Sequence, residues 1–244
     1  MAITRKAILI GAPGVTPALP GVVTDINDIR NFLLSDCGGA WRPNEIITII
    51  DQNSTEIYRQ LEMTSNIDYI LITCSGHGEH VRGKGIDETL MYLSEKEKIS
   101  ISSINPKNKR HLVIADICRN LVLIHKDEMR EMKKAAVCES AKKAHIDYRK
   151  IFDDCVMSNP EGRIVAYSCS IDQSAGDDGT GGVFTQELLK APSNFSHSNS
   201  CGYGIVKIDK AFERAKDMTY KRNAPQLPVF NAGRRMHFYP FAII

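Results

Sequence analysis

Short apolar runs recur along the chain, separated by segments whose apolar residues lie three and four positions apart. A continuous apolar run of about four to eight residues is typical of a strand buried on both faces, and the wider spacing predicts amphipathic helices. Alternation of the two favours an α/β fold with a mostly parallel sheet and helices on both faces. The predicted strands are Lys6–Gly11, Glu45–Ile50, Asp68–Cys74, His111–Asp116, Arg163–Tyr167 and a last strand after Leu227.

The segments between these strands predict four helices and one antiparallel ribbon. Thr24 is the expected N-cap of the first helix. Leu90–Leu93 and Lys98–Ile101 predict the ribbon. Lys126–Asp154 is rich in charged residues with weak helical spacing, which predicts an exposed helix or a mobile insert. The predicted helices are Thr24–Ser35, Ser54–Met63, Val183–Leu189 and Ile205–Thr219.

Composition narrows the class of protein. The chain has 244 residues, of which 43% are hydrophobic and 25% charged, which is ordinary for a globular domain. Lys plus Arg total 31 against 29 for Asp plus Glu, so charge gives no reason to expect nucleic acid as a partner. The longest apolar runs are far shorter than a membrane span, and Ala7–Ile10 is too short for a signal peptide. We therefore expect a cytoplasmic protein with no membrane partner.

The number and spacing of the cysteines also favour a cytoplasmic protein. Seven occur, in scattered positions and with no Cys-x-x-Cys motif, which argues against a disulfide framework and a zinc ribbon. Most are expected to be small buried apolar residues. They are Cys37, Cys74, Cys118, Cys138, Cys155, Cys169 and Cys201.

Candidate chemistry lies where two successive strands end. Ser75–Gly78 (Ser-Gly-His-Gly) follows the third strand, and Asp116–Arg119 (Asp-Ile-Cys-Arg) follows the fourth. Ligands of open α/β sheets bind at the carboxyl ends of the strands, so His77 and Cys118 are expected to face one crevice. An imidazole that removes the thiol proton creates a strong nucleophile, and glycines beside it suit an oxyanion hole.

A zinc site is the alternative use of these residues. Cys74, His77 and His80 with Cys118 could supply four ligands that zinc accepts. Their spacing is not that of a common zinc module, and the position of the residues at strand ends explains them without a metal. We therefore predict no metal and no other cofactor.

These motifs resemble those of the caspase-like cysteine peptidases, the clan of caspases, metacaspases and their bacterial relatives. Ser75–Gly78 matches the family's Ser-Gly-His-Gly loop, and Asp116–Arg119 matches the Asp-x-Cys element of metacaspases. Animal caspases have Gln where Asp116 stands. The interval from His77 to Cys118 is 118 − 77 = 41 residues, close to the roughly 50 of caspases. Further similar stretches are Leu19–Asp25, Ser168–Ala175, Gly182–Thr185 and Ala224–Pro228.

The resemblance implies a fold and an activity. The fold would be one caspase-like three-layer α-β-α sandwich with a mostly parallel six-stranded sheet. It would contain a large-subunit-like part of about 1–124, a linker of about 125–158 and a small-subunit-like part of about 159–244. The activity would be that of a cysteine endopeptidase acting on protein or peptide substrates. His77 would serve as general base and acid, Cys118 as nucleophile, and the N–H groups of Gly78 and Cys118 as the oxyanion hole.

The resemblance also implies a substrate pocket. Asp25, Ser75 and Asp116 would line it, and paired carboxylates would favour cleavage after Arg or Lys over cleavage after Asp. The structural alternative is that Asp25 caps its own helix and Asp116 orients the Cys118 loop. Asp172, with Arg119 and Gln173, either shapes the substrate groove or belongs to a solvated loop.

A catalytically silent scaffold that binds a partner is the second candidate function. Inactive members of the clan usually lack the His or the Cys, and this chain has both. An active pair predicts that a thiol reagent labels Cys118 first, with a pH profile below that of a free thiol near 8.5. A separate activator protein, the oligomeric state and any need for cleavage stay open.

Overall fold

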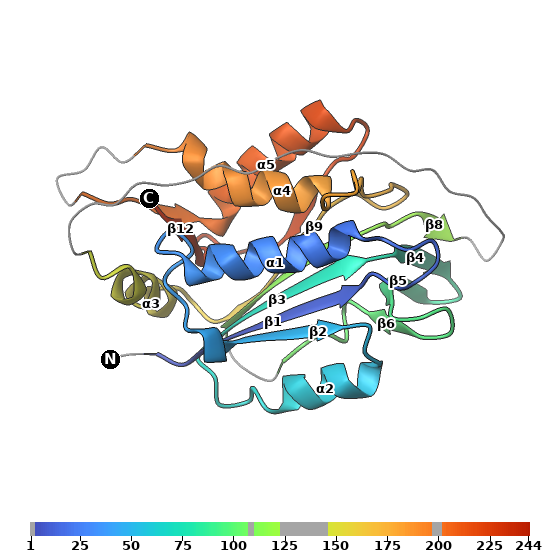
Figure 1. Ribbon diagram of the computed structural model, residues 1–244, viewed down its shortest axis with the longest axis horizontal. Coiled ribbons are helices and arrows are strands. Elements are labelled where there is room, and N and C mark those ends of the chain that lie inside the picture. Colours follow the sequence, from blue (N-terminus) through green and yellow to red (C-terminus); the bar gives the residue numbers. More distant parts are fainter. Residues whose placement is uncertain (1–2, 107–109, 123–145, 197–201) are drawn as a thin grey trace.

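A six-stranded sheet forms the centre of the molecule (Figure 1), seen here in a computed structural model that describes residues 3–106, 110–122, 146–196 and 202–244. Its strands are β1 (Arg5–Ala12), β2 (Ile46–Ile50), β3 (Tyr69–Gly76), β7 (Arg110–Ile117), β9 (Gly162–Tyr167) and β11 (Val229–Asn231). Their order is β11-β9-β7-β3-β1-β2, and only β11 runs antiparallel to its neighbour. The mostly parallel sheet predicted from the apolar runs is therefore confirmed.

Helices cover both faces of this sheet, as predicted. They are α1 (Gly21–Leu34), α2 (Ser54–Glu62), α3 (Tyr148–Ser158), α4 (Val183–Lys190) and α5 (Ile208–Arg222), with short 3-10 helices η1 (Pro43–Glu45) and η2 (Ala191–Asn194). Figure 1 shows α1, α4 and α5 on one face and α2 on the other. Ile26, Phe184 and Phe212 belong to the core on the first face, and Ile57 and Leu61 of α2 to the core on the second.

A second sheet lies beyond the carboxyl ends of β3 and β7 (Figure 1). It contains β4 (Gly78–Gly83), β5 (Ile86–Tyr92), β6 (Lys98–Ser100) and β8 (Leu121–Val122), in the order β6-β5-β4-β8. The antiparallel β5–β6 ribbon was predicted, whereas β4 and β8 were not. A further pair joins β10 (Ile205–Lys207) to β12 (Pro240–Ile243).

Two predicted helix boundaries are wrong. The first helix begins at Gly21, with Pro20 at the N-cap position, so Thr24 lies inside it. The helix predicted from Ile205 begins at Ile208, because the three residues before it pair with β12 as strand β10. Strand β12 is far from β10 in the sequence, so local spacing does not reveal this pairing.

Part of the charged segment Lys126–Asp154 belongs to the folded core. Residues 126–145 lie outside the described part of the chain, but the remainder enters α3. Phe152 on this helix is only 2% exposed, and Asp153 pairs with buried Arg5 at 3.2 Å. The expectation of an exposed helix is therefore wrong for α3, which is held by packing and charge.

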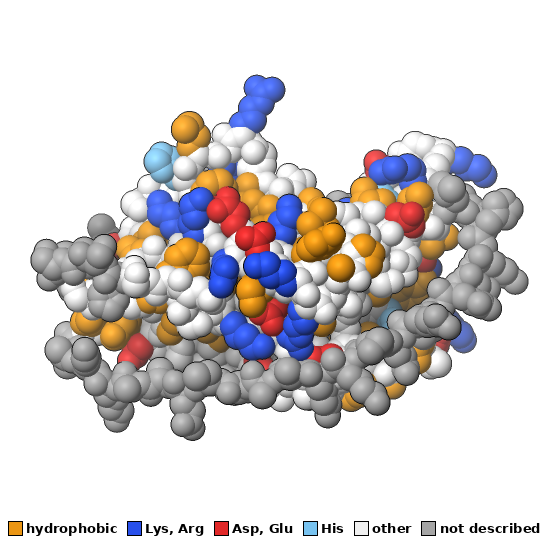
Figure 2. Space-filling view, turned by 90° about the horizontal axis from the view of Figure 1, so that it is seen from above, with side chains coloured by type: hydrophobic (Ala, Val, Ile, Leu, Met, Phe, Trp, Pro, Cys, Tyr) orange, Lys and Arg blue, Asp and Glu red, His pale blue; other side chains and the backbone are white. Residues whose placement is uncertain are grey.

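The face of the molecule seen in Figure 2 carries charges of both signs. Figure 2 shows Lys and Arg interspersed with Asp and Glu on the face seen from above. Among the helices described, none is both long and apolar enough to cross a membrane.

Candidate active site

Strand register brings His77 and Cys118 to neighbouring positions. Gly76 at the end of β3 is paired with Ile117 at the end of β7, and the two candidate residues follow directly. A Cβ added to Gly78 would lie 2.7 Å from the carbonyl oxygen of Cys118, so the His77–Gly78 backbone packs closely against the nucleophile. A side chain at Gly78 would push these two segments apart.

The His77 ring is held by the loop after β1. Its Nε2 lies 2.6 Å from the carbonyl oxygen of Pro17. A carbonyl oxygen only accepts hydrogen bonds, so Nε2 carries the proton and, in the neutral ring, Nδ1 is the basic nitrogen. The main-chain oxygen of His77 also accepts a bond from the N–H of Tyr92 at 3.0 Å. Within the described chain, no hydrogen bond joins the imidazole to the Cys118 thiol.

The Cys118 thiol is protonated in this arrangement. Its Sγ donates to the carbonyl oxygen of Ala175 at 3.8 Å. Burial raises the pKa of Cys118, and the nearby charge of Asp116 raises it further. Burial thus favours a neutral thiol in this structure, contrary to the low thiol pKa expected of an active pair.

Asp25 and Asp116 converge on the beginning of α4. Asp25 accepts a hydrogen bond from the Ser75 hydroxyl at 2.7 Å and another from the Gly182 N–H at 2.8 Å. Asp116 accepts from the N–H and the hydroxyl of Thr185, at 3.0 and 2.7 Å. The two residues are 2% and 6% exposed. The structure thus brings the expected pocket residues together, with their carboxyl groups bound to the first turn of α4.

The local electrostatics follow from this burial. Unpaired N–H groups and the helix dipole make the beginning of α4 attractive to negative charge. Desolvation nonetheless raises the pKa of Asp25 well above its ordinary value, and the charge of Asp116 adds to the effect. Desolvation likewise raises the pKa of Asp116. The suggestion that Asp25 caps its own helix is wrong, because it binds the N-cap residue of α4.

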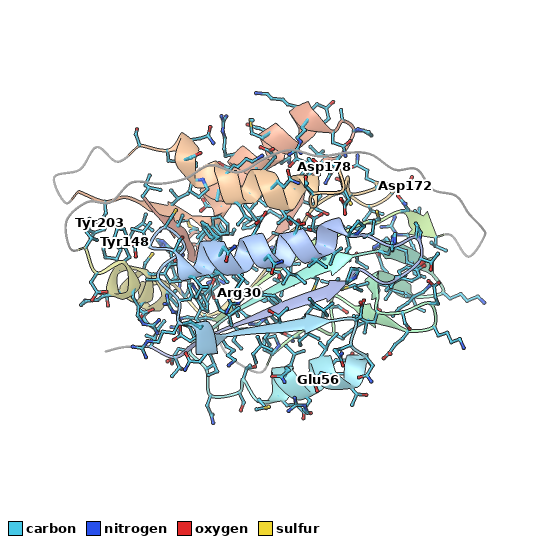
Figure 3. The ribbon with its side chains drawn as sticks, viewed as in Figure 1. Arg30, Glu56, Tyr148, Asp172, Asp178 and Tyr203 are labelled. Carbon is cyan, nitrogen blue, oxygen red and sulfur yellow. The ribbon has the colours of Figure 1, made fainter. Side chains whose placement is uncertain are left out.

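The other expected groove residues hold loops together. Asp172 is exposed, has a φ of 65°, and accepts a hydrogen bond from the Leu121 N–H at 3.2 Å (Figure 3). Arg119 is buried, and its guanidinium donates to the Thr89 hydroxyl at 3.0 Å. Gln173 donates to the main-chain oxygen of residue 225 at 2.7 Å. Of the three, Asp172 alone is an exposed charge.

The zinc alternative finds no support. The two ring nitrogens of His80 lie 3.0 Å from the Thr89 hydroxyl and 2.6 Å from Asp87. Cys74 is buried in the core, where desolvation raises its pKa to about 12. In the part of the chain that the structure describes, no three His, Cys, Asp or Glu side chains are grouped to hold a metal.

Asp178 is a buried charged residue near this site (Figure 3). The sequence did not indicate its position. It is 1% exposed, accepts bonds from the N–H and hydroxyl of Thr180, and forms an ion pair with Arg222 of α5. The only sequence signal is an Asp–Gly pair, which predicts a turn and gives no distant partner.

Comparison with known proteins places this arrangement in a family. The model of the caspase domain of peptidase family C14 matches residues 4–239. The chain belongs to the caspase-domain family. Caspase-1 from Spodoptera frugiperda has a similar structure, with a TM-score of 0.60 and 13% identity, over 98% of this chain and 90% of that one. No curated protein sequence matches the chain.

These similarities identify a caspase-like α-β-α sandwich, as the resemblance implied. At 13% identity the structural match speaks for the fold alone. Membership of the caspase-domain family supports, in general terms, a cysteine peptidase that acts on protein substrates.

Proposed function

We propose that this caspase domain is an endopeptidase in which Cys118 is the nucleophile and His77 the general base and acid. The observation that carries the proposal is the register of β3 and β7, which ends with paired residues directly before the two side chains. The Pro17 carbonyl supports the same assignment, because it leaves Nδ1 of His77 as the basic nitrogen.

The proposed reaction starts from neutral groups. Nδ1 takes the thiol proton as Sγ attacks the peptide carbonyl carbon, and the N–H groups of Gly78 and Cys118 stabilise the oxyanion. The imidazolium, held at Nε2 by Pro17, then protonates the leaving amine. Water, deprotonated by the same base, hydrolyses the acyl-enzyme. Because burial raises the thiol pKa, proton transfer is coupled to attack.

We propose that the pocket prefers Arg or Lys before the scissile bond. Asp25 and Asp116 repel each other in a desolvated site, and Asp177 adds negative charge to both. A substrate guanidinium or ammonium would relieve that repulsion, whereas an acidic side chain would increase it. Asp172 is proposed as a rim residue, because it is exposed and binds Leu121 three positions past the nucleophile.

Replacement of the two catalytic residues tests the peptidase. Cys118→Ala and His77→Ala should each abolish cleavage of a peptide library, and the double variant should be scarcely worse than either. Cys37→Ala is the matched control, since Cys37 is another partly exposed free cysteine. Full activity in either single variant would reject the assignment.

Paired substrates test the pocket. Asp116→Ala should reduce kcat/KM about 10- to 150-fold on an Arg substrate and far less on a neutral isostere, the range for a hydrogen bond between charged groups. Efficient cleavage after Asp, or equal losses on both substrates, would overturn the preference.

A silent scaffold is the second candidate, favoured by the raised pKa of Cys118 and by its lack of a bond to His77 within the described chain. It predicts no cleavage by the wild-type protein and unchanged partner binding by Cys118→Ala.

A further inference from the structure

The turn between β5 and β6 reaches across to the loop that follows β1. Glu95 on this turn is exposed, and its Oε1 accepts a hydrogen bond from the N–H of Thr16 at 2.6 Å. The N–H and hydroxyl of Thr16 hold the pKa of Glu95 below its ordinary value. The carboxylate is therefore the bound form, and it ties two segments 79 residues apart.

The residue next to Thr16 is the one that orients the imidazole. Pro17 accepts the Nε2 proton of His77, so the Glu95 bond lies one residue from the carbonyl that defines the ring tautomer. The His77 main chain is held by the same ribbon, through the N–H of Tyr92 on β5. The β5–β6 ribbon thus acts on His77 in two ways. Strand β5 binds the main chain of His77, and Glu95 on the turn holds the loop whose carbonyl binds the ring.

Other bonds hold the ends of this loop. Leu19 donates to the carbonyl oxygen of Pro13 at 2.9 Å, and Gly14 donates to Asp51 at 3.1 Å. Both lie farther along the chain from Pro17 than the Glu95 bond does. Without the carboxylate, exposed Thr16 can bond to water, and of these three bonds the one that lies nearest to Pro17 in the sequence is lost.

We propose that Glu95 is a positioning residue for the general base. By holding Thr16 it keeps the Pro17 carbonyl on Nε2 of His77, which leaves Nδ1 free to take the thiol proton. Its negative charge also attracts the imidazolium that forms during the reaction. The catalytic part of this inference rests on the proposed peptidase function, whereas the positioning part does not.

The ring tautomer tests positioning without any need for activity. In ¹⁵N NMR spectra assigned with a His77→Gln variant, neutral His77 should be protonated at Nε2 in the wild type. Glu95→Ala should give a mixture of tautomers, and Glu95→Gln, which keeps an acceptor oxygen, should restore the single form. Glu97→Ala is the matched control, because Glu97 lies on the same turn and binds the N–H of Ser54 at 2.9 Å instead.

Kinetics test the consequence for catalysis. Glu95→Ala should lower kcat about 10-fold and leave KM within about 2-fold of the wild-type value. A positioned general base contributes roughly 100-fold or more to the rate, and a misplaced base would lose part of that contribution. Glu95→Gln should recover most of kcat, and Glu97→Ala should retain it. A wild-type kcat and tautomer in Glu95→Ala, or equal losses in Glu97→Ala, would overturn the proposal. If the wild type cleaves no peptide, the peptidase proposal fails, and the tautomer alone decides the role of Glu95.

Discussion

Gly182 is the position at which the packing of α4 against Asp116 can be tested most directly. A Cβ added to Gly182 would lie 2.8 Å from the carboxyl carbon of Asp116, and closer still to Oδ2, the oxygen that binds Thr185. The backbone of Gly182, with φ −62° and ψ 131°, accepts alanine without strain. Gly182→Ala therefore perturbs the carboxyl group and leaves the helix start itself unstrained.

The expected cost follows from the two bonds that Asp116 would lose. Nonbonded carbon atoms pack at about 3.5 Å or more, so the carboxyl group must retreat by at least about 0.7 Å. Its bonds to Thr185 measure 3.0 and 2.7 Å and would not survive that movement. Bonds to a charged group are worth about 1.5–3 kcal/mol each and are not independent, so we expect a loss of about 2–4 kcal/mol of unfolding free energy.

A double-mutant cycle provides the assay. Urea unfolding of the wild type, Gly182→Ala, Asp116→Ala and the double variant gives the coupling between the two positions. With the carboxyl group already removed, Gly182→Ala should cost only about 0.5–1 kcal/mol, the usual price of alanine at an N-cap. Equal costs in the two backgrounds would refute the claim that Asp116 fills the space beside Gly182.

Three further predictions concern the site. Gly78→Ala should lower kcat/KM at least about 10-fold and lower Tm, because its Cβ would press on the Cys118 carbonyl; wild-type kinetics would show that this close approach is dispensable. Since burial raises the folded-state pKa of Asp25, the folded protein binds more protons than the unfolded one, and stability falls as pH rises through and above the ordinary aspartate pKa of 3.8. Asp25→Asn should show a flatter profile in urea unfolding between about pH 4 and pH 7, and parallel profiles would contradict the raised pKa. Alkylation of Cys118 by iodoacetamide should rise with a midpoint above that of an ordinary thiol, and a midpoint below it would indicate a preformed ion pair.

Most of the fold could be predicted from local sequence patterns. The apolar runs of β1, β3 and β7 are strong signals because both faces of these strands are buried. One helix boundary was wrong because a distant partner decides the structure. Ile205 fits a helix or a strand by spacing alone, and its pairing with Ile243 makes it a strand.

The residues of the candidate site likewise include some that local sequence predicts and some that depend on distant contacts. His77 and Cys118 could be selected because each follows a strong strand signal. The hydrogen bond from the Gly182 N–H to Asp25 joins residues 157 positions apart, and the sequence around either residue does not predict it. Glu95 looks like any charged residue of a turn, so its contact with Thr16 emerges only when the loops are placed in space.

The ladder between β7 and β9 joins directly the two parts of the chain that flank the expected linker. Six residue pairs, from Arg110–Gly162 to Ala115–Tyr167, join the strand before the proposed linker to the strand after it. Helix α3 comes after residue 145 in the sequence, yet its Asp153 is paired with Arg5 of β1, near the beginning of the chain. A backbone break between residues 123 and 145 would therefore yield two interlocked polypeptides, with His77 and Cys118 on one and the Gly182 N–H that binds Asp25 on the other.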